Sequence, residues 1–307
     1  MMAEKSVVTR SPSLILSFLY ALIPLLVLMV ATFLACILAY SLVSAAGDAV
    51  SFRTIIKKAS QVFLVLSIFP AMRYLGLTKL DLGFAARVRF IKQIFQGVGL
   101  GFITLMPVFL ALYLLGVNVV DETQPWTAFW VSKKLVIELL LALLISFFEE
   151  PVFRGLLISG LSRKMSITAA ILISAFYYAI LHFLNSPIEI PAAEINLFSG
   201  FVLLGDAFNH LLNPEILSAF LALFTVGVFL GIIRTQLKAS LGLCIGCHAC
   251  WVWQIKLSKS LFNINPDSDY LYLVSSYDGV IGPLVTVWLV LAMTGYFLYK
   301  RKNCQSF

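Results

Sequence analysis

Charged residues divide this chain into long apolar runs, and this pattern constrains the fold more than any other feature. Only 12% of the 307 residues are charged, 61% are hydrophobic, and the mean hydropathy is +0.97. A soluble protein carries about 25% charged residues, because its surface must be hydrated. The sequence therefore excludes a soluble globule and predicts an integral membrane protein.

Eight apolar runs approach the length of about 20 residues that a helix needs to cross a bilayer. We therefore expect an all-α bundle of about eight transmembrane helices, forming a single membrane domain over residues 1–307. A ninth apolar segment, Glu194–Asn213, is interrupted by glycine and polar residues, and we expect a hairpin or an interfacial helix there. The eight predicted spans are Pro12–Val43, Ser60–Leu75, Ile94–Val117, Leu135–Leu161, Ile167–Phe183, Ile216–Arg234, Leu241–Gln254 and Val280–Tyr299.

The net charge of +7 follows from cationic clusters at the ends of these spans, which is the distribution that the positive-inside rule describes. It predicts cytoplasmic termini, and it does not indicate a nucleic-acid partner. Arg53, Lys57 and Lys58 break the pattern, so either they begin an amphipathic interfacial helix or the first predicted boundary is misplaced. The chain has no N-x-[ST] acceptor, which favours a bacterial inner membrane over a eukaryotic secretory one.

Three GxxxG pairs lie within the predicted spans, at Gly97/Gly101, Gly227/Gly231 and Gly242/Gly246. Small residues at this spacing let two helix backbones approach closely in lipid. We interpret all three pairs as helix-packing sites.

Ionisable residues inside predicted spans are the strongest functional signal, because a charge at membrane depth costs about 2.5–3.5 kcal/mol. Glu150 and Arg154 have the i,i+4 spacing of a helical ion pair. Glu149 lies about 100° around the same helix and has no local cation. Burial raises the pKa of an unpaired carboxyl group, which suits it to act as a general base. Pro151 is expected to bend the helix beside them.

Two histidines lie at similar predicted depths in other spans, His182 near the end of one and His248 in the middle of another. Three helices could thus bring Glu149, His182 and His248 to one point within the membrane. One carboxylate and two imidazoles can hold a divalent metal such as zinc with one position open for water. The same three side chains can also act without metal, as a base and oxyanion stabilisers.

The motif Glu149-Glu150-x-x-x-Arg154 resembles the EExxxR signature of the CPBP (Abi) intramembrane proteases, which include the type II CAAX prenyl endopeptidases. Tyr178-x-x-x-His182 resembles the second motif of that family, and His248 the third. The resemblance covers about Leu135–Val252, which we expect to be the catalytic core.

The resemblance implies an intramembrane endopeptidase, which is a metalloprotease if zinc is bound. It is expected to act on a membrane-associated protein or peptide, lipidated proteins included. It makes Glu149 the base that activates water, with Glu150 and Arg154 supporting it and His182 and His248 binding metal or the oxyanion. Two residues depart from the family pattern. Tyr178 replaces a phenylalanine, and its hydroxyl is near enough in sequence to hydrogen-bond His182. Val252 replaces an asparagine, which removes a donor for the oxyanion.

Other motifs have weaker functional readings. His210 has no motif around it and reads as an interfacial residue. Cys244-x-x-Cys247-His248 matches a haem-attachment pattern but falls inside an apolar span, and the terminal Cys304-Gln-Ser-Phe matches a C-a-a-X box only formally.

Two alternatives to a protease stay open. One is a catalytically impaired membrane scaffold, which Val252 favours. The other is a proton-coupled transporter, which the absence of internal repeats disfavours.

Overall fold

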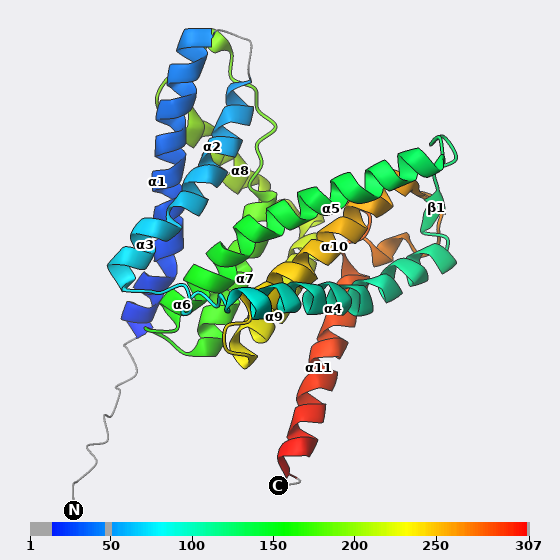
Figure 1. Cartoon of the computed structure of the whole chain (residues 1–307). Coiled ribbons are helices and arrows are strands. Elements are labelled where there is room, and N and C mark those ends of the chain that lie inside the picture. Colours follow the sequence, from blue (N-terminus) through cyan, green and yellow to red (C-terminus); the bar gives the residue numbers. More distant parts are fainter. Residues whose placement is uncertain (1–13, 47–50, 306–307) are drawn as a thin grey trace, which may run out of the picture.

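The computed structural model describes residues 14–46 and 51–305, and nearly all of the regular structure in them is helical (Figure 1). Pro12 at the start of the first predicted span, the cations Lys5 and Arg10, and the last two residues of the C-a-a-X pattern lie outside the described residues. The helices are α1 (Leu14–Ala46), α2 (Phe52–Leu66), α3 (Ile68–Leu75), α4 (Arg87–Leu114), α5 (Ala128–Glu150), α6 (Ile158–Leu161), α7 (Ile167–Phe183), α8 (Ser199–His210), α9 (Leu217–Gln236), α10 (Leu241–Leu261) and α11 (Pro283–Gln305).

The predicted all-α membrane bundle is confirmed, and the number of eight spans is approximate. Five described helical segments are long and apolar enough to cross a bilayer: Ile15–Ala45, Phe52–Leu75, Arg87–Leu114, Pro214–Gln236 and Pro283–Asn303. The apolar helix α7 is shorter than these. The other two predicted spans correspond to α5 and α10, which are helical as expected but carry the charged and polar residues of the motifs.

The start of the second span differs from the prediction, and this bears on the cations that break the charge pattern. The second candidate span begins at Phe52 rather than Ser60, so Arg53 and Lys57 lie in the first turns of helix α2, which is amphipathic. Arg53 forms an ion pair with Glu189, at 3.2 Å, and Lys57 donates to the side-chain oxygen of Asn185. The acidic and polar loop after α7 therefore compensates these cations. Counting charges along the sequence cannot predict such a contact, because the partners are far apart in the chain.

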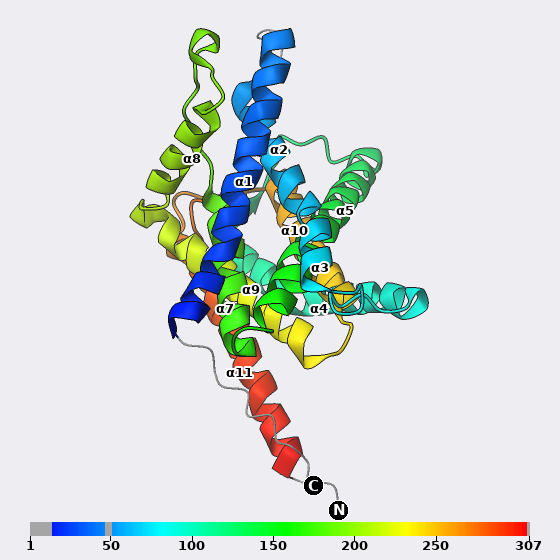
Figure 2. The same ribbon diagram turned by 90° about the vertical axis from the view of Figure 1, so that its left-hand side faces the viewer.

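The segment Glu194–Asn213 forms one helix, α8, rather than a hairpin. Its 12 residues reach about 18 Å, too short to cross a hydrocarbon core of about 30 Å. Helix α8 packs on α1 and α2 (Figure 2), where Gly200 lies against the thiol of Cys36 and against Ile56. The three helices share a small apolar core of their own.

The main core is formed by helices that are pressed together at the predicted glycine pairs. Gly97 and Gly101 of α4 face α10, and Gly242 and Gly246 of α10 face α4 in return. A Cβ atom at Gly246 would collide with the backbone carbonyl oxygen of Ile94. Gly227 and Gly231 of α9 lie against α7 in the same way. The glycines therefore hold α10 and α7, the two histidine-bearing helices, against their neighbours.

A short antiparallel sheet closes one end of this core. Strand β1 (Asn118–Val120) follows α4, and β2 (Phe262–Ile264) follows α10. The register pairs Asn118 with Ile264. The strands tie together the ends of the two helices that the glycines hold side by side.

Candidate active site

The helix that carries the two adjacent glutamates changes its geometry immediately after them. Helix α5 ends at Glu150, and a π-helical segment runs over Pro151–Leu157 before α6. Pro151 has no backbone N–H, so the regular hydrogen-bond pattern cannot continue through it. Such π-helical turns occur frequently at functional sites, because they reorient the side chains beside them. The predicted bend at Pro151 is thus realised as a π-helical segment.

Glu150 and Arg154 form the predicted ion pair in a fully buried position. The Nη1 atom of Arg154 lies 3.1 Å from Oε1 of Glu150, and the two side chains are 1% and 0% exposed. The same Oε1 atom lies 2.7 Å from Nδ1 of His248, which α10 contributes. The guanidinium group of Arg154 also lies 4.3 Å from the ring centroid of Tyr178. Glu150 thus links an arginine from its own chain segment to a histidine from another helix.

Glu149 occupies a different environment from its neighbour. Its side chain is 31% exposed, and its Oε2 atom lies 3.9 Å from Nε2 of His248. That oxygen is itself buried and has no hydrogen-bond partner among the described residues, and the same holds for Oε2 of Glu150 and for Nε and Nη2 of Arg154. Buried polar atoms are normally satisfied by protein or by ordered water. The site can therefore accept a water molecule or a polar substrate group next to Glu149.

The hydrogen bonds of the two histidines fix their tautomers. Nδ1 of His182 lies 2.7 Å from the backbone carbonyl oxygen of Tyr178, and a carbonyl oxygen only accepts, so Nδ1 carries the proton. Nδ1 of His248 faces the carboxylate of Glu150 and donates to it in the same way. In the neutral form of either ring, Nε2 therefore keeps its lone pair. Each Nε2 atom can accept a hydrogen bond or bind a cation, and it donates only when the ring is protonated.

Tyr178 connects the two histidines. Its ring centroid lies 4.5 Å from that of His182 and 5.9 Å from that of His248. The hydroxyl group, however, lies 3.3 Å from Nε2 of His248, so the expected hydrogen bond to His182 is wrong. On one helix, the side chains at i and i+4 stack on the same face, and the phenol oxygen extends past His182 to the facing helix α10.

The structure thus brings Glu149, Glu150, Arg154 and His248 into one hydrogen-bonded or ion-paired cluster, with His182 joined to it through Tyr178. The donor types of Glu149, His182 and His248 suit zinc. Among the described residues, however, no group of three or more His, Cys, Asp or Glu side chains is arranged to hold a metal ion. His210 lies at the end of α8, outside this cluster, as expected. Cys244 and Cys247 are free and buried.

Sequence reasoning missed the loop before α11, which supplies two further groups near the site. The ring of Tyr277 packs 5.0 Å from that of Phe183, the residue after His182. Burial raises the pKa of Tyr277 above its ordinary value, and the charges of Asp278 and Glu149 act in the same direction. Asp278 accepts hydrogen bonds from the backbone N–H groups of Val280 and Ile281. No spacing in the sequence links this loop to the three motifs, since only the fold brings it there.

A family model described as type II CAAX prenyl endopeptidase Rce1-like matches residues 130–254. This segment is Rce1-like. It contains every residue of the cluster described above, and the resemblance predicted from the three motifs is confirmed. The matched segment is shorter than half of the chain, and the family that it is similar to is that of intramembrane proteases of the CAAX type. Comparisons with curated proteins and with solved structures gave no match.

Proposed function

We propose that the protein hydrolyses a peptide bond in a membrane-associated protein or peptide, with Glu149 as the base that activates water. The observation that carries this proposal is the contrast between two adjacent carboxylates. Glu150 is fully buried and engaged by Arg154 and His248, whereas Glu149 is partly exposed and its buried Oε2 atom is free to accept a proton. A general base must lie within reach of the water that it deprotonates, and only Glu149 has such access.

The other residues have supporting roles in this proposal. Arg154 neutralises Glu150, and Glu150 accepts from Nδ1 of His248, so that Nε2 of His248 faces Glu149. Water bound at Oε2 of Glu149, beside the ring of His248, loses a proton to Glu149 and attacks the substrate carbonyl carbon. The proton on Glu149 then passes to the departing amine. His182, held by its own helix backbone, lines the same site through Tyr178.

A divalent metal such as zinc, bound by Glu149, His182 and His248, stays a prediction of the sequence, and so does the assignment as a metalloprotease. Location in a bacterial inner membrane with both termini in the cytoplasm also stays a prediction. Lipidated proteins are the candidate substrates, because the matched family is that of CAAX prenyl endopeptidases.

The proposal is tested with the purified full-length chain in liposomes and a set of peptides that end in a C-a-a-X sequence, with and without a prenyl group. Mass spectrometry identifies the cleavage products. Wild type is expected to release the terminal tripeptide, and Glu149→Gln is expected to release none. Equal cleavage by wild type and Glu149→Gln would exclude Glu149 as the base.

A catalytically impaired scaffold is the second candidate, and Val252 is the observation that favours it. This residue follows His248 by one helical turn on α10, where the family motif places an asparagine. Loss of an oxyanion donor costs about 10²–10³ in rate. A wild-type chain that binds C-a-a-X peptides without cleaving them, and still binds them after His182→Ala and His248→Ala, would support the scaffold.

A further inference from the structure

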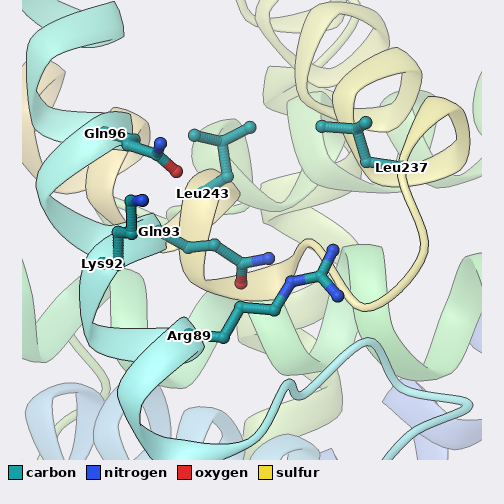
Figure 3. Close-up of a pocket in the computed structure, with 6 residues that line it drawn as sticks. All are labelled: Arg89, Lys92, Gln93, Gln96, Leu237 and Leu243. Atoms are coloured by element: carbon teal, nitrogen blue, oxygen red, sulfur yellow. The ribbon is translucent and has the colours of Figure 1, made fainter.

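A basic hollow lies at the start of α4, apart from the candidate active site (Figure 3). It has a volume of about 370 Å³ and is lined by Arg89, Lys92, Gln93, Gln96, Leu237 and Leu243. The four polar residues follow an i, i+3, i+4, i+7 pattern, which places them on one face of α4 over two turns. Leu237 and Leu243, from the chain around the start of α10, form the opposite wall.

The hollow carries positive charge that the protein does not neutralise. Arg89 and Lys92 are both exposed, and in residues 14–46 and 51–305 no carboxylate lies within ion-pair distance of either one. Gln96 is also exposed, although it lies two turns inside a helix that is apolar enough to span a membrane. An amide exposed to hydrocarbon costs several kcal/mol without a hydrogen-bond partner. A polar neighbour for Gln96 and an anionic one for Arg89 and Lys92 would therefore be favourable at the edge of the membrane.

The same face of α4 continues as a shallow apolar groove, whose lining residues all belong to α4. A second hollow, of about 350 Å³, is lined by Phe102, Ile103, Met106, Pro107 and Leu110. At 3.6 residues per turn, Arg89, Lys92, Gln96, Ile103, Pro107 and Leu110 fall within a sector of about 60° on the helix. Ile103 and Leu110 are 72% and 57% exposed, so the groove is open to lipid. One face of the helix thus changes from cationic to apolar along its length.

We propose that this face of α4 binds one anionic phospholipid, with its phosphate at Arg89 and Lys92 and an acyl chain along Ile103–Leu110. Arginine and lysine side chains bind phosphate groups by charge-assisted hydrogen bonds, and basic pockets at the ends of transmembrane helices bind anionic lipid head groups. Along the helix, Lys92 lies about 17 Å from Ile103 and about 27 Å from Leu110, so this face reaches from the head groups through one leaflet of a bilayer about 40–45 Å thick. A free phosphate ion would use the basic hollow and leave the apolar groove without a role.

The test measures lipid binding by native mass spectrometry of the delipidated full-length chain. The probes are dipalmitoyl phosphatidylglycerol, dipalmitoyl phosphatidylcholine and glycerol 3-phosphate. We expect the phosphatidylglycerol to bind more tightly than either of the other two. The double variant Arg89→Gln/Lys92→Gln is expected to bind it about 30-fold more weakly, since each cation near a membrane surface contributes about fivefold. Arg73→Gln/Lys79→Gln, which removes two exposed cations outside the hollow, is expected to bind it as wild type does.

A second pair of substitutions tests the acyl groove. Ile103→Gln/Leu110→Gln is expected to weaken the binding of phosphatidylglycerol and to leave that of glycerol 3-phosphate unchanged. Equal affinity for phosphatidylglycerol and glycerol 3-phosphate would show that the hollow binds a soluble anion rather than a lipid. Equal losses in the Arg89/Lys92 and Arg73/Lys79 double variants, or equal binding of the two phospholipids, would show that the hollow has no specific role.

Discussion

The two sides of the candidate active site differ in how tightly the protein holds them. On the packed side, Glu150, Arg154 and His248 are at most 3% exposed, and α10 is pressed against α4 through glycines. On the open side, Glu149 is 31% exposed, and the loop with Tyr277 and Asp278 lies beside His182. Tight packing suits the first side to fix the geometry of the cluster, and partial exposure suits the second side to admit water. Loss of a residue should therefore affect stability on one side and activity on the other.

Glu149→Gln should have the largest effect on activity and almost none on stability. General base catalysis contributes about 10²–10⁴ in rate, so cleavage of the C-a-a-X peptides is expected to fall by about that factor. The amide keeps the shape of the side chain, and its neighbour Glu150 stays paired. Thermal unfolding in detergent checks the expectation that stability is unchanged. A melting temperature well below that of wild type would contradict the assignment of Glu149 to the open side.

Glu150→Gln should have the largest effect on stability. It leaves the buried guanidinium group of Arg154 without a counter-charge, and breaking a buried pair in this way costs about 3–5 kcal/mol. The control is Glu138→Gln, which breaks the more exposed pair of Glu138 with Lys256 between α5 and α10 and is expected to cost less, because the Lys256 side chain is 35% exposed. Denaturant unfolding measures both variants, and equal losses would show that burial does not distinguish the two pairs.

Gly246→Ala should destabilise the packed side by about 1–3 kcal/mol, because the added methyl group collides with the backbone carbonyl oxygen of Ile94. Gly99→Ala is the matched control on α4, since a Cβ atom there meets nothing within 4 Å. Removal of a helical glycine at an open position is expected to stabilise by about 0.5–1 kcal/mol. Gly246→Ala is therefore expected to lower the free energy of unfolding, and Gly99→Ala is expected to raise it.

Tyr178→Phe should lower kcat/KM by about 5–10-fold, because Nε2 of His248 loses a hydrogen bond with a net value of about 1 kcal/mol. The control is Tyr177→Phe, whose hydroxyl donates to the backbone oxygen of Ala21 away from the site. Val252→Asn added to Tyr178→Phe restores the two residues of the family motifs, and we expect it to recover activity. Unchanged activity in Tyr178→Phe would show that His248 does not need this contact.

Asp278 should give the open side a small pH dependence. Burial raises the pKa of its carboxyl group above the ordinary value of 3.8, although two backbone N–H groups, Lys259 and His182 act in the opposite direction. The raised pKa in the folded state means that its contribution to stability is full below pH 3.8 and is lost as the pH rises through the folded-state pKa. Asp278→Asn keeps an acceptor oxygen and removes the titration. The variant should therefore lose part of the pH dependence of unfolding in this acidic range, and an unchanged pH profile would contradict the burial of this carboxylate.

The two sides also differ in how well they can be predicted. Glu150 and Arg154 form a local i,i+4 pair, and the glycine pairs show their packing role by spacing alone, so both features of the packed side follow from the sequence. His248 joins this side from α10, at a separation of 98 residues from Glu150. Its depth in the membrane can be predicted from residue counts, but its hydrogen-bond partner cannot. The open side depends almost wholly on contacts between distant segments, including the loop with Tyr277 and Asp278.

The sequence by itself determined the membrane class, the helical fold and the identity of the motif residues, because hydrophobic runs and helical spacing are local properties of the chain. It also separated Glu149 from Glu150, since adjacent residues on a helix face different directions. Only the tertiary structure decided that Tyr178 contacts His248, that Arg53 is compensated by the loop after α7, and that residues 194–213 form a single helix on α1 and α2. These outcomes depend on which helices lie side by side, and that is set by the packing of whole surfaces rather than by any short stretch of sequence.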